Sequence, residues 1–125
     1  MRKFAREQAV RLLDKLREQM TRASDKGDAD SIHDLRVAIR RFTQCLRIFK
    51  SFLTNGDTRK IRKRLKRIMD RAAEVRDRDV ALELLAAAGP IGDPGMAAAL
   101  RRGRDQAHRA LLAEIRRVHR KRLEL

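Results

Sequence analysis

Basic side chains recur at helical spacing between residues 31 and 50. Separated by three or four residues, they form the row His33, Arg36, Arg40, Thr43, Arg47 and Lys50. Residues at these spacings are neighbours on a helix surface, so five of the six make one cationic stripe roughly 25 Å long. The row contains no acid, although a merely solvated surface would be served by mixed charges. The chemistry that this pattern predicts is electrostatic binding of an elongated anion.

The same segment predicts the helix that positions the stripe. Its apolar residues also repeat every three or four positions: Ile32, Leu35, Ile39, Phe42, Leu46, Phe49 and Leu53. The stripe therefore runs beside a buried seam, where a groove between packed helices would open. Ser31 resembles an N-cap with Asp34 three residues later, which would place His33 in the first helical turn. Backbone N–H groups at that end favour a bound phosphate oxygen.

Composition supports an anionic partner. The 125 residues suit one domain spanning 1–125, and 32 Lys and Arg against 17 Asp and Glu give a net charge of +15 at pH 7. Such an excess is typical of proteins that bind polyanions. Aromatic residues are only 3%, with no Trp or Tyr, and the four Phe residues are assigned to helix packing. Modules for single-stranded nucleic acid stack bases on aromatic rings, so we expect contact with phosphates rather than bases.

Periodicity elsewhere predicts three more helices and no strand. The expected helices span about 3–23, 31–53, 58–88 and 95–122. Short connections between helices of this length predict an all-α, antiparallel four-helix bundle. Between the last two helices, Asp93 followed by Pro94 matches an N-cap with proline at the first helical position.

Basic rows also occur on the later helices. The first half of the third helix is dense in cations, and the fourth has a short row of Arg101, Arg104 and His108. Asp79 falls on the apolar seam of the third helix, where an unpaired acid is costly, so we expect Arg76 and Arg78 to pair with it.

Residues typical of enzymes are poorly arranged for catalysis. The single Cys45 excludes an internal disulfide and a cysteine zinc site, and its place in the helix favours a structural thiol. No histidine pair has metal-ligand spacing, and Asp77 and Asp79 diverge by about 200° around a helix. No phosphate-binding glycine loop or activated nucleophile occurs. We therefore expect no catalysis, no metal and no cofactor.

The sequence has no apolar segment long enough to span a membrane and no signal sequence. We therefore expect a cytoplasmic protein without a membrane partner.

Two blocks of the sequence resemble the CHAD family, the conserved-histidine α-helical domain. The first block is His33-Asp-Leu-Arg-Val-Ala-Ile-Arg-Arg41 with Leu46-Arg-Ile-Phe49, and the second is Leu65-Lys-Arg67 with Glu74-Val-Arg-Asp-Arg-Asp-Val-Ala81. The resemblance implies an all-helical fold of two four-helix bundles around a basic channel that binds inorganic polyphosphate, often at polyphosphate granules. Carried over by motif position, the channel residues would be His33, Arg36, Arg40, Arg41, Arg47, Lys63, Lys66 and Arg67, with Arg76 beside its acidic partners.

A complete domain of that family is about twice as long as this chain. The resemblance therefore covers one four-helix half, and a homodimer would rebuild the two-bundle arrangement through true two-fold symmetry. Thr43 stands where the first block often has a basic residue, which would remove one phosphate contact.

Polyphosphate binding without catalysis is the function that these features predict. The expected binding residues are His33, Arg36, Arg40, Arg41, Arg47, Lys50, Lys63, Lys66, Arg67, Arg76, Arg101, Arg104 and His108. One alternative is a nucleic-acid or nucleoid-binding protein, which the net charge alone would permit; nucleic acid is otherwise expected only as a non-specific competitor. The other is a polyphosphate-processing phosphohydrolase, for which the sequence lacks an acidic metal cluster.

Overall fold

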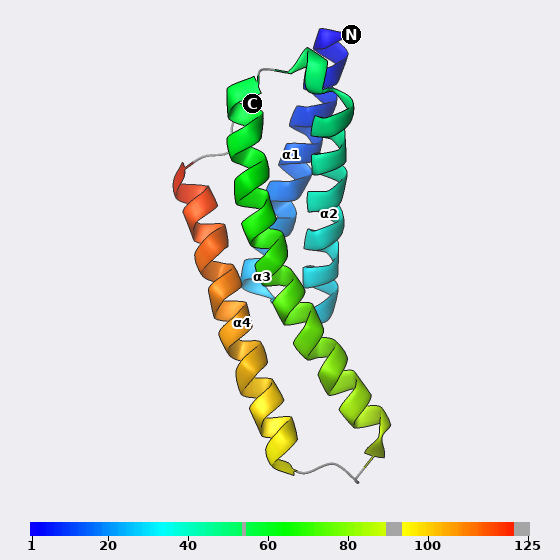
Figure 1. The fold of residues 1–125 in the computed structure, drawn as a ribbon, viewed down its shortest axis with the longest axis vertical. Coiled ribbons are helices and arrows are strands. Elements are labelled where there is room, and N and C mark those ends of the chain that lie inside the picture. Colours follow the sequence, from blue (N-terminus) through cyan, green and yellow to red (C-terminus); the bar gives the residue numbers. More distant parts are fainter. Residues whose placement is uncertain (54, 90–93, 122–125) are drawn as a thin grey trace.

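Four long helices make up the chain. The computed structural model describes residues 1–53, 55–89 and 94–121, with side chains at 1–53, 58–89 and 94–120. The helices are α1 (Arg2–Asp25), α2 (Ala29–Ile48), α3 (Asn55–Ala87) and α4 (Pro94–Lys121), and a short 3-10 helix, η1 (Lys50–Phe52), follows α2. Consecutive helices run in opposite directions along the long axis (Figure 1). The predicted all-α class with four long helices is confirmed, and no strand occurs in the described ranges.

Apolar seams from all four helices meet in one core. The seam predicted for α2 is buried from Ile32 to Leu46, and Phe42 is its largest fully enclosed side chain. Leu16 and Met20 of α1 pack into the same cluster. Burying each such large side chain contributes about 1.5–3 kcal/mol, so this cluster holds α2 and its basic stripe in place.

The N-terminus of α2 differs from the prediction. The helix begins at Ala29, and its N-cap is Asp28, whose carboxylate accepts a hydrogen bond from the backbone N–H of Ser31 at 2.9 Å. The Ser31 hydroxyl donates back to the Asp28 carbonyl oxygen, also at 2.9 Å. Ser31 is therefore not the N-cap, because the aspartate three residues earlier already occupies that role. His33 consequently lies beyond the first turn and away from the free backbone N–H groups.

Other helix ends agree with the predictions to within a few residues. Helix α2 ends at Ile48 rather than Leu53, yet Phe49 and Leu53 still pack against the core as partly buried side chains. Helix α4 begins at Pro94, which confirms proline at the first helical position. The expected cap at Asp93 lies outside the described residues.

Helices α3 and α4 extend past the connection between α1 and α2 (Figure 1). Burial along both helices stops at a similar level: Val75 is the last fully buried residue of the α3 seam, and Ala107 is the first on α4. Met96, predicted to face inward, is 53% exposed. That prediction is wrong because neither α1 nor α2 reaches the end of the molecule where Met96 lies.

Candidate functional site

A basic groove of about 980 Å³ lies between α2 and α3. Its floor is apolar and is formed by Ile39, Leu46 and Met69. Seven basic side chains line it, namely Arg40, Arg47, Lys50, Arg59, Arg62, Lys63 and Lys66. All seven are solvent-exposed, and Asp70 is the single acid among the lining residues. The groove therefore offers a strongly positive wall above an apolar floor.

The α2 side of the groove follows directly from the predicted stripe. Arg40, Thr43 and Arg47 lie on successive turns of α2, and Lys50 of η1 extends the row. Because the stripe adjoins the buried seam, packing of α3 on that seam leaves these side chains at the rim. The structure thus places the C-terminal part of the predicted stripe, from Arg40 to Lys50, along the groove.

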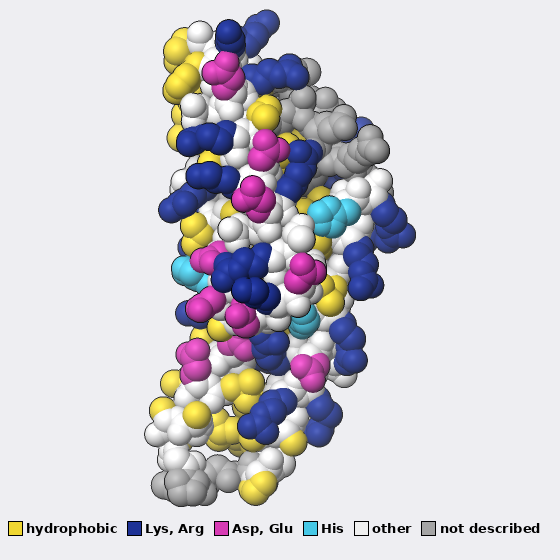
Figure 2. Space-filling model, turned by 180° about the vertical axis from the view of Figure 1, so that it is seen from behind, with side chains coloured by type: hydrophobic (Ala, Val, Ile, Leu, Met, Phe, Trp, Pro, Cys, Tyr) yellow, Lys and Arg dark blue, Asp and Glu magenta, His cyan; other side chains and the backbone are white. Residues whose placement is uncertain are grey.

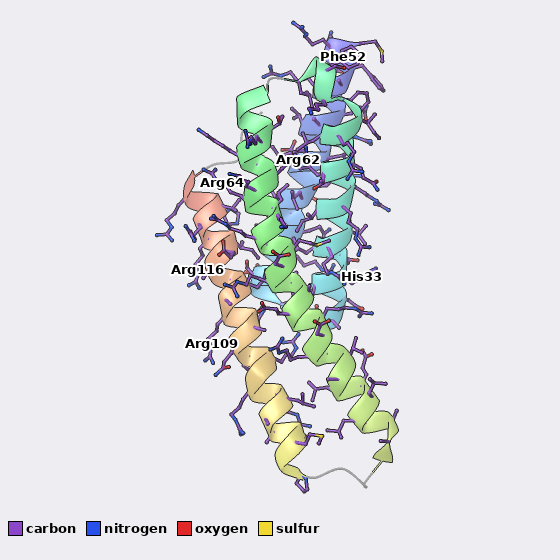
Figure 3. All side chains as sticks on the ribbon, in the orientation of Figure 1. His33, Phe52, Arg62, Arg64, Arg109 and Arg116 are labelled. Atoms are coloured by element: carbon purple, nitrogen blue, oxygen red, sulfur yellow. The ribbon has the colours of Figure 1, made fainter. Side chains whose placement is uncertain are left out.

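The α3 side includes residues that the sequence-based site omitted. Lys63 and Lys66 were predicted and line the groove, whereas Arg59 and Arg62 were recognised only as part of a basic helix. Figure 3 shows Arg62 on the side of α3 toward α2 and Arg64 on the side toward α4. The spacing of 59, 62, 63 and 66 places them on one helical face, but the sequence did not say which face meets α2.

No ion pair among the described side chains neutralises the charges in the groove. The ion pairs within the described side chains are Arg17–Asp14, Arg22–Asp34, Arg71–Glu74, Arg104–Asp79 and Arg117–Glu114. None of them involves a basic residue of the groove. Clustered cations without internal counterions raise the local concentration of anions and are available for direct contact. An anionic ligand would therefore gain interactions without displacing ion pairs of the fold.

Arg36 continues the cationic stripe of α2 one helical turn beyond the groove. Its Nε atom is buried and has no hydrogen-bond partner among the described residues. Burial lowers the pKa of Arg36, and the positive charges of Arg40 and Arg76 lower it further, whereas Asp77 opposes the shift. Arg40 and Arg76 therefore each lie close enough to repel the charge of Arg36. An anion bound beside these three side chains would offset that repulsion.

Arg104 and His108 occupy a different part of the molecule. Arg104 donates through Nε to Asp79 at 2.6 Å and through Nη2 to the carbonyl oxygen of Gly27. The expected pairing of Asp79 with Arg76 and Arg78 is thus wrong: Arg78 instead donates to the Glu74 carbonyl oxygen, because its side chain turns back along α3. Arg104 consequently has a structural role in joining α4 to α3 and to the α1–α2 connection.

His108 packs against Gly27, and a Cβ atom there would overlap its ring. Burial lowers the pKa of His108, the Arg104 charge adds to the shift, and Asp105 and Asp79 oppose it. The neutral imidazole is therefore favoured, which makes His108 a weak attraction for an anion.

The remaining predicted binding residues do not line the groove. Exposed side chains of this kind are His33 and Arg41 on α2, Arg67 on α3 and Arg101 on α4. Figure 3 shows His33 at the outer edge of α2, on the side away from α4. The structure thus brings five of the thirteen predicted residues into the groove and places Arg36 and Arg76 in the neighbouring arginine cluster. These four residues, like Arg104 and His108, lie outside both.

The part of the chain that the structure describes contains neither a candidate metal site nor a helix able to span a membrane. No group of three or more His, Cys, Asp or Glu side chains there could hold a metal ion. None of the helices there combines the length and apolarity that crossing a bilayer requires.

Comparison with known proteins gives one match, to a protein family. No curated protein and no solved structure matches the chain. The family model described as the CHAD domain matches residues 7–125, nearly the whole sequence. This match covers both sequence blocks, the whole of α2, α3 and α4, and α1 from residue 7 onward. The chain therefore belongs to the CHAD family.

Proposed function

We propose that this protein binds inorganic polyphosphate in the groove between α2 and α3. The observation that supports this most directly is the set of seven exposed Lys and Arg side chains along one groove, with no internal ion pair among the described residues. Membership of the CHAD family, often linked to polyphosphate binding, supports the same ligand.

Binding would be electrostatic and would use two kinds of contact. Arginine forks such as Arg47 and Arg62 can grip two oxygens of a phosphate, whereas Lys63 and Lys66 supply point charges. Neutralising successive phosphates releases condensed counterions, so affinity should fall steeply as salt rises. The location that follows from this proposal is at polyphosphate granules in the cytoplasm.

Nucleic acid is a weaker candidate for the same groove. Its lining contains no aromatic side chain on which a base could stack. The opposite face of the molecule carries Asp and Glu side chains between its Lys and Arg side chains (Figure 2), which makes uniform wrapping by duplex DNA unfavourable. A titration with long-chain polyphosphate, using duplex DNA of equal charge as competitor, separates the two ligands. Displacement of polyphosphate by DNA at equal charge concentration would favour a general polyanion surface.

The groove assignment is tested by reversing charges in matched pairs. Arg47→Glu with Arg62→Glu should weaken polyphosphate binding more than tenfold and flatten its salt dependence by about one unit of slope per lost phosphate contact. The control pair, Arg109→Glu with Arg116→Glu, makes the same charge change on exposed residues of α4 that project away from α3 (Figure 3). Equal loss in both variants, with helicity retained in circular dichroism, would show that net charge rather than the groove determines affinity.

The proposal is for binding without hydrolysis. A phosphate-release assay with long-chain polyphosphate and magnesium addresses the phosphohydrolase alternative. Release that scales with protein concentration, and that the Arg47→Glu, Arg62→Glu variant loses, would replace binding by processing as the function.

A further inference from the structure

The packing of α3 and α4 changes abruptly along their length. Up to Val75 and from Ala107 onward, their apolar seams are covered by α1 and α2. The Arg104–Asp79 ion pair and the hydrogen bond from Arg104 to Gly27 close the end of this core. Beyond that level, α3 and α4 continue as a hairpin without α1 or α2 alongside (Figure 1).

The projecting hairpin, residues 80–89 and 94–100, is here called the tip. It exposes large apolar side chains: Leu84 is 67% exposed and Met96 is 53% exposed. Leu82, Leu85 and Leu100, which continue the seams, are only partly buried. Figure 2 shows hydrophobic side chains gathered at this end, around a hollow between the two helices. Contiguous apolar surface of this kind is typical of an interaction site.

The tip is also poor in charge. Within residues 80–89 and 94–100, Glu83 is the single charged side chain, although the whole chain has a net charge of +15. Two copies of so basic a protein repel each other across most of their surface. Contact through the tips keeps Lys and Arg side chains out of the interface and so minimises this repulsion. An acidic protein or an anionic membrane would instead be attracted to the basic surfaces elsewhere.

We propose that the tip docks against the tip of a second copy, forming a two-fold symmetric dimer. The α3 and α4 tip of the partner would cover the apolar seams that α1 and α2 cover elsewhere, and the same patch on both subunits would be buried. A standard interface of about 800 Å² per partner corresponds to roughly a tenth of the 8345 Å² accessible surface of this chain.

The dimer does not depend on the proposed function. The α3 residues of the basic groove, 58–70, end ten residues before the tip begins, which is roughly 15 Å along the helix. Both grooves would therefore stay open in the dimer. The test is performed without polyphosphate, so that its result says nothing for or against binding in the groove.

Molar mass in solution tests the dimer directly. Light scattering and sedimentation of the full chain should give twice the chain mass, and dimerisation should strengthen as salt screens the repulsion between subunits. This salt dependence is opposite to that expected for polyphosphate binding. Leu84→Lys with Met96→Lys should give a monomer of unchanged helicity, because both side chains are exposed. The matched control, Val10→Lys with Ile48→Lys, changes two exposed apolar residues outside the tip and should leave the dimer intact.

Three results would overturn the proposal. The first is a folded wild-type protein with the mass of one chain at every salt concentration. The second is a dimer that the Leu84→Lys, Met96→Lys variant retains. The third is a monomeric wild type that binds vesicles of phosphatidylcholine and phosphatidylglycerol and loses that binding in the same variant, which would assign the tip to a membrane surface. A polyphosphate titration of the variant reports separately on the groove.

Discussion

Arg104 of α4 donates through Nε to the carboxylate of Asp79 on α3, with a distance of 2.6 Å between the two atoms. The Arg104 side chain is 20% exposed and that of Asp79 is 12% exposed, so water screens this ion pair only weakly. A second donor of the same guanidinium reaches the carbonyl oxygen of Gly27. One side chain thus connects α4, α3 and the α1–α2 connection at the end of the core.

Removing the charge of Arg104 should destabilise the protein strongly. Arg104→Met leaves the Asp79 carboxylate without its partner, which should lower the free energy of unfolding by about 3 kcal/mol, the lower end of the range for breaking a buried pair. Urea denaturation followed by circular dichroism measures the change. Arg101→Met, at an exposed position of the same helix, is the control and should have little effect. Replacing both partners, in Arg104→Met with Asp79→Leu, should recover part of the loss; no recovery would contradict this account.

Gly27 should not tolerate a side chain. Its φ of 63° lies in the left-handed region, which costs a residue with a Cβ atom about 1–2 kcal/mol, and that Cβ atom would also overlap Cε1 and Nε2 of His108. Gly89 has a similar φ of 77° but no neighbouring atom within 4 Å of an added Cβ. Gly27→Ala should therefore lower the melting temperature more than Gly89→Ala does. Equal losses in thermal unfolding would mean that contact with His108 contributes nothing.

Stability should decrease below about pH 6.5 because of His108. Burial lowers the pKa of its imidazole in the folded chain, so the unfolded chain binds a proton first as the pH falls. The stability from the neutral ring is complete above the unfolded pKa and is lost as the pH falls through the lower folded value. Unfolding free energies measured between pH 5 and 8 should show this slope. His108→Gln should reduce it and His119→Gln, at an exposed position of α4, should not; an unchanged slope in His108→Gln would reject the assignment.

Arg36 should destabilise the unliganded protein and yet strengthen polyphosphate binding. Its buried Nε atom lacks an acceptor, and Arg40 and Arg76 repel its charge. Arg36→Met should therefore raise the stability of the free protein by up to about 1 kcal/mol, the range for relieving an unsatisfied buried donor. The same variant should bind polyphosphate more weakly, because it removes one positive charge beside the groove. Arg41→Met, an exposed change on the same helix, should alter stability little. A less stable Arg36→Met protein would indicate a packing role instead.

The sequence alone determined the helices, the seam of α2 and the basic row beside it. These features are local: spacings of three and four residues place Arg40, Arg47 and Lys50 on one face of any helix that buries Ile39 and Leu46. The family resemblance was equally readable, because the two blocks lie within continuous stretches of chain. The N-cap of α2 was misplaced because Asp28 and Ser31 are both good capping residues. The folded backbone decides between them: Asp28 is extended and accepts from the Ser31 N–H.

Tertiary structure decided everything that depends on how helices meet. The third helix is basic on several faces, and only the way it packs against α2 selects Arg59 and Arg62 for the groove rather than Arg64 or Arg67. Arg104 belongs to a basic row by sequence, yet contact with Asp79 makes it structural. Met96 belongs to an apolar seam, yet the offset between the two helical pairs leaves it exposed. Periodicity within one helix describes its faces, whereas the neighbour of each face depends on the packing of the whole chain.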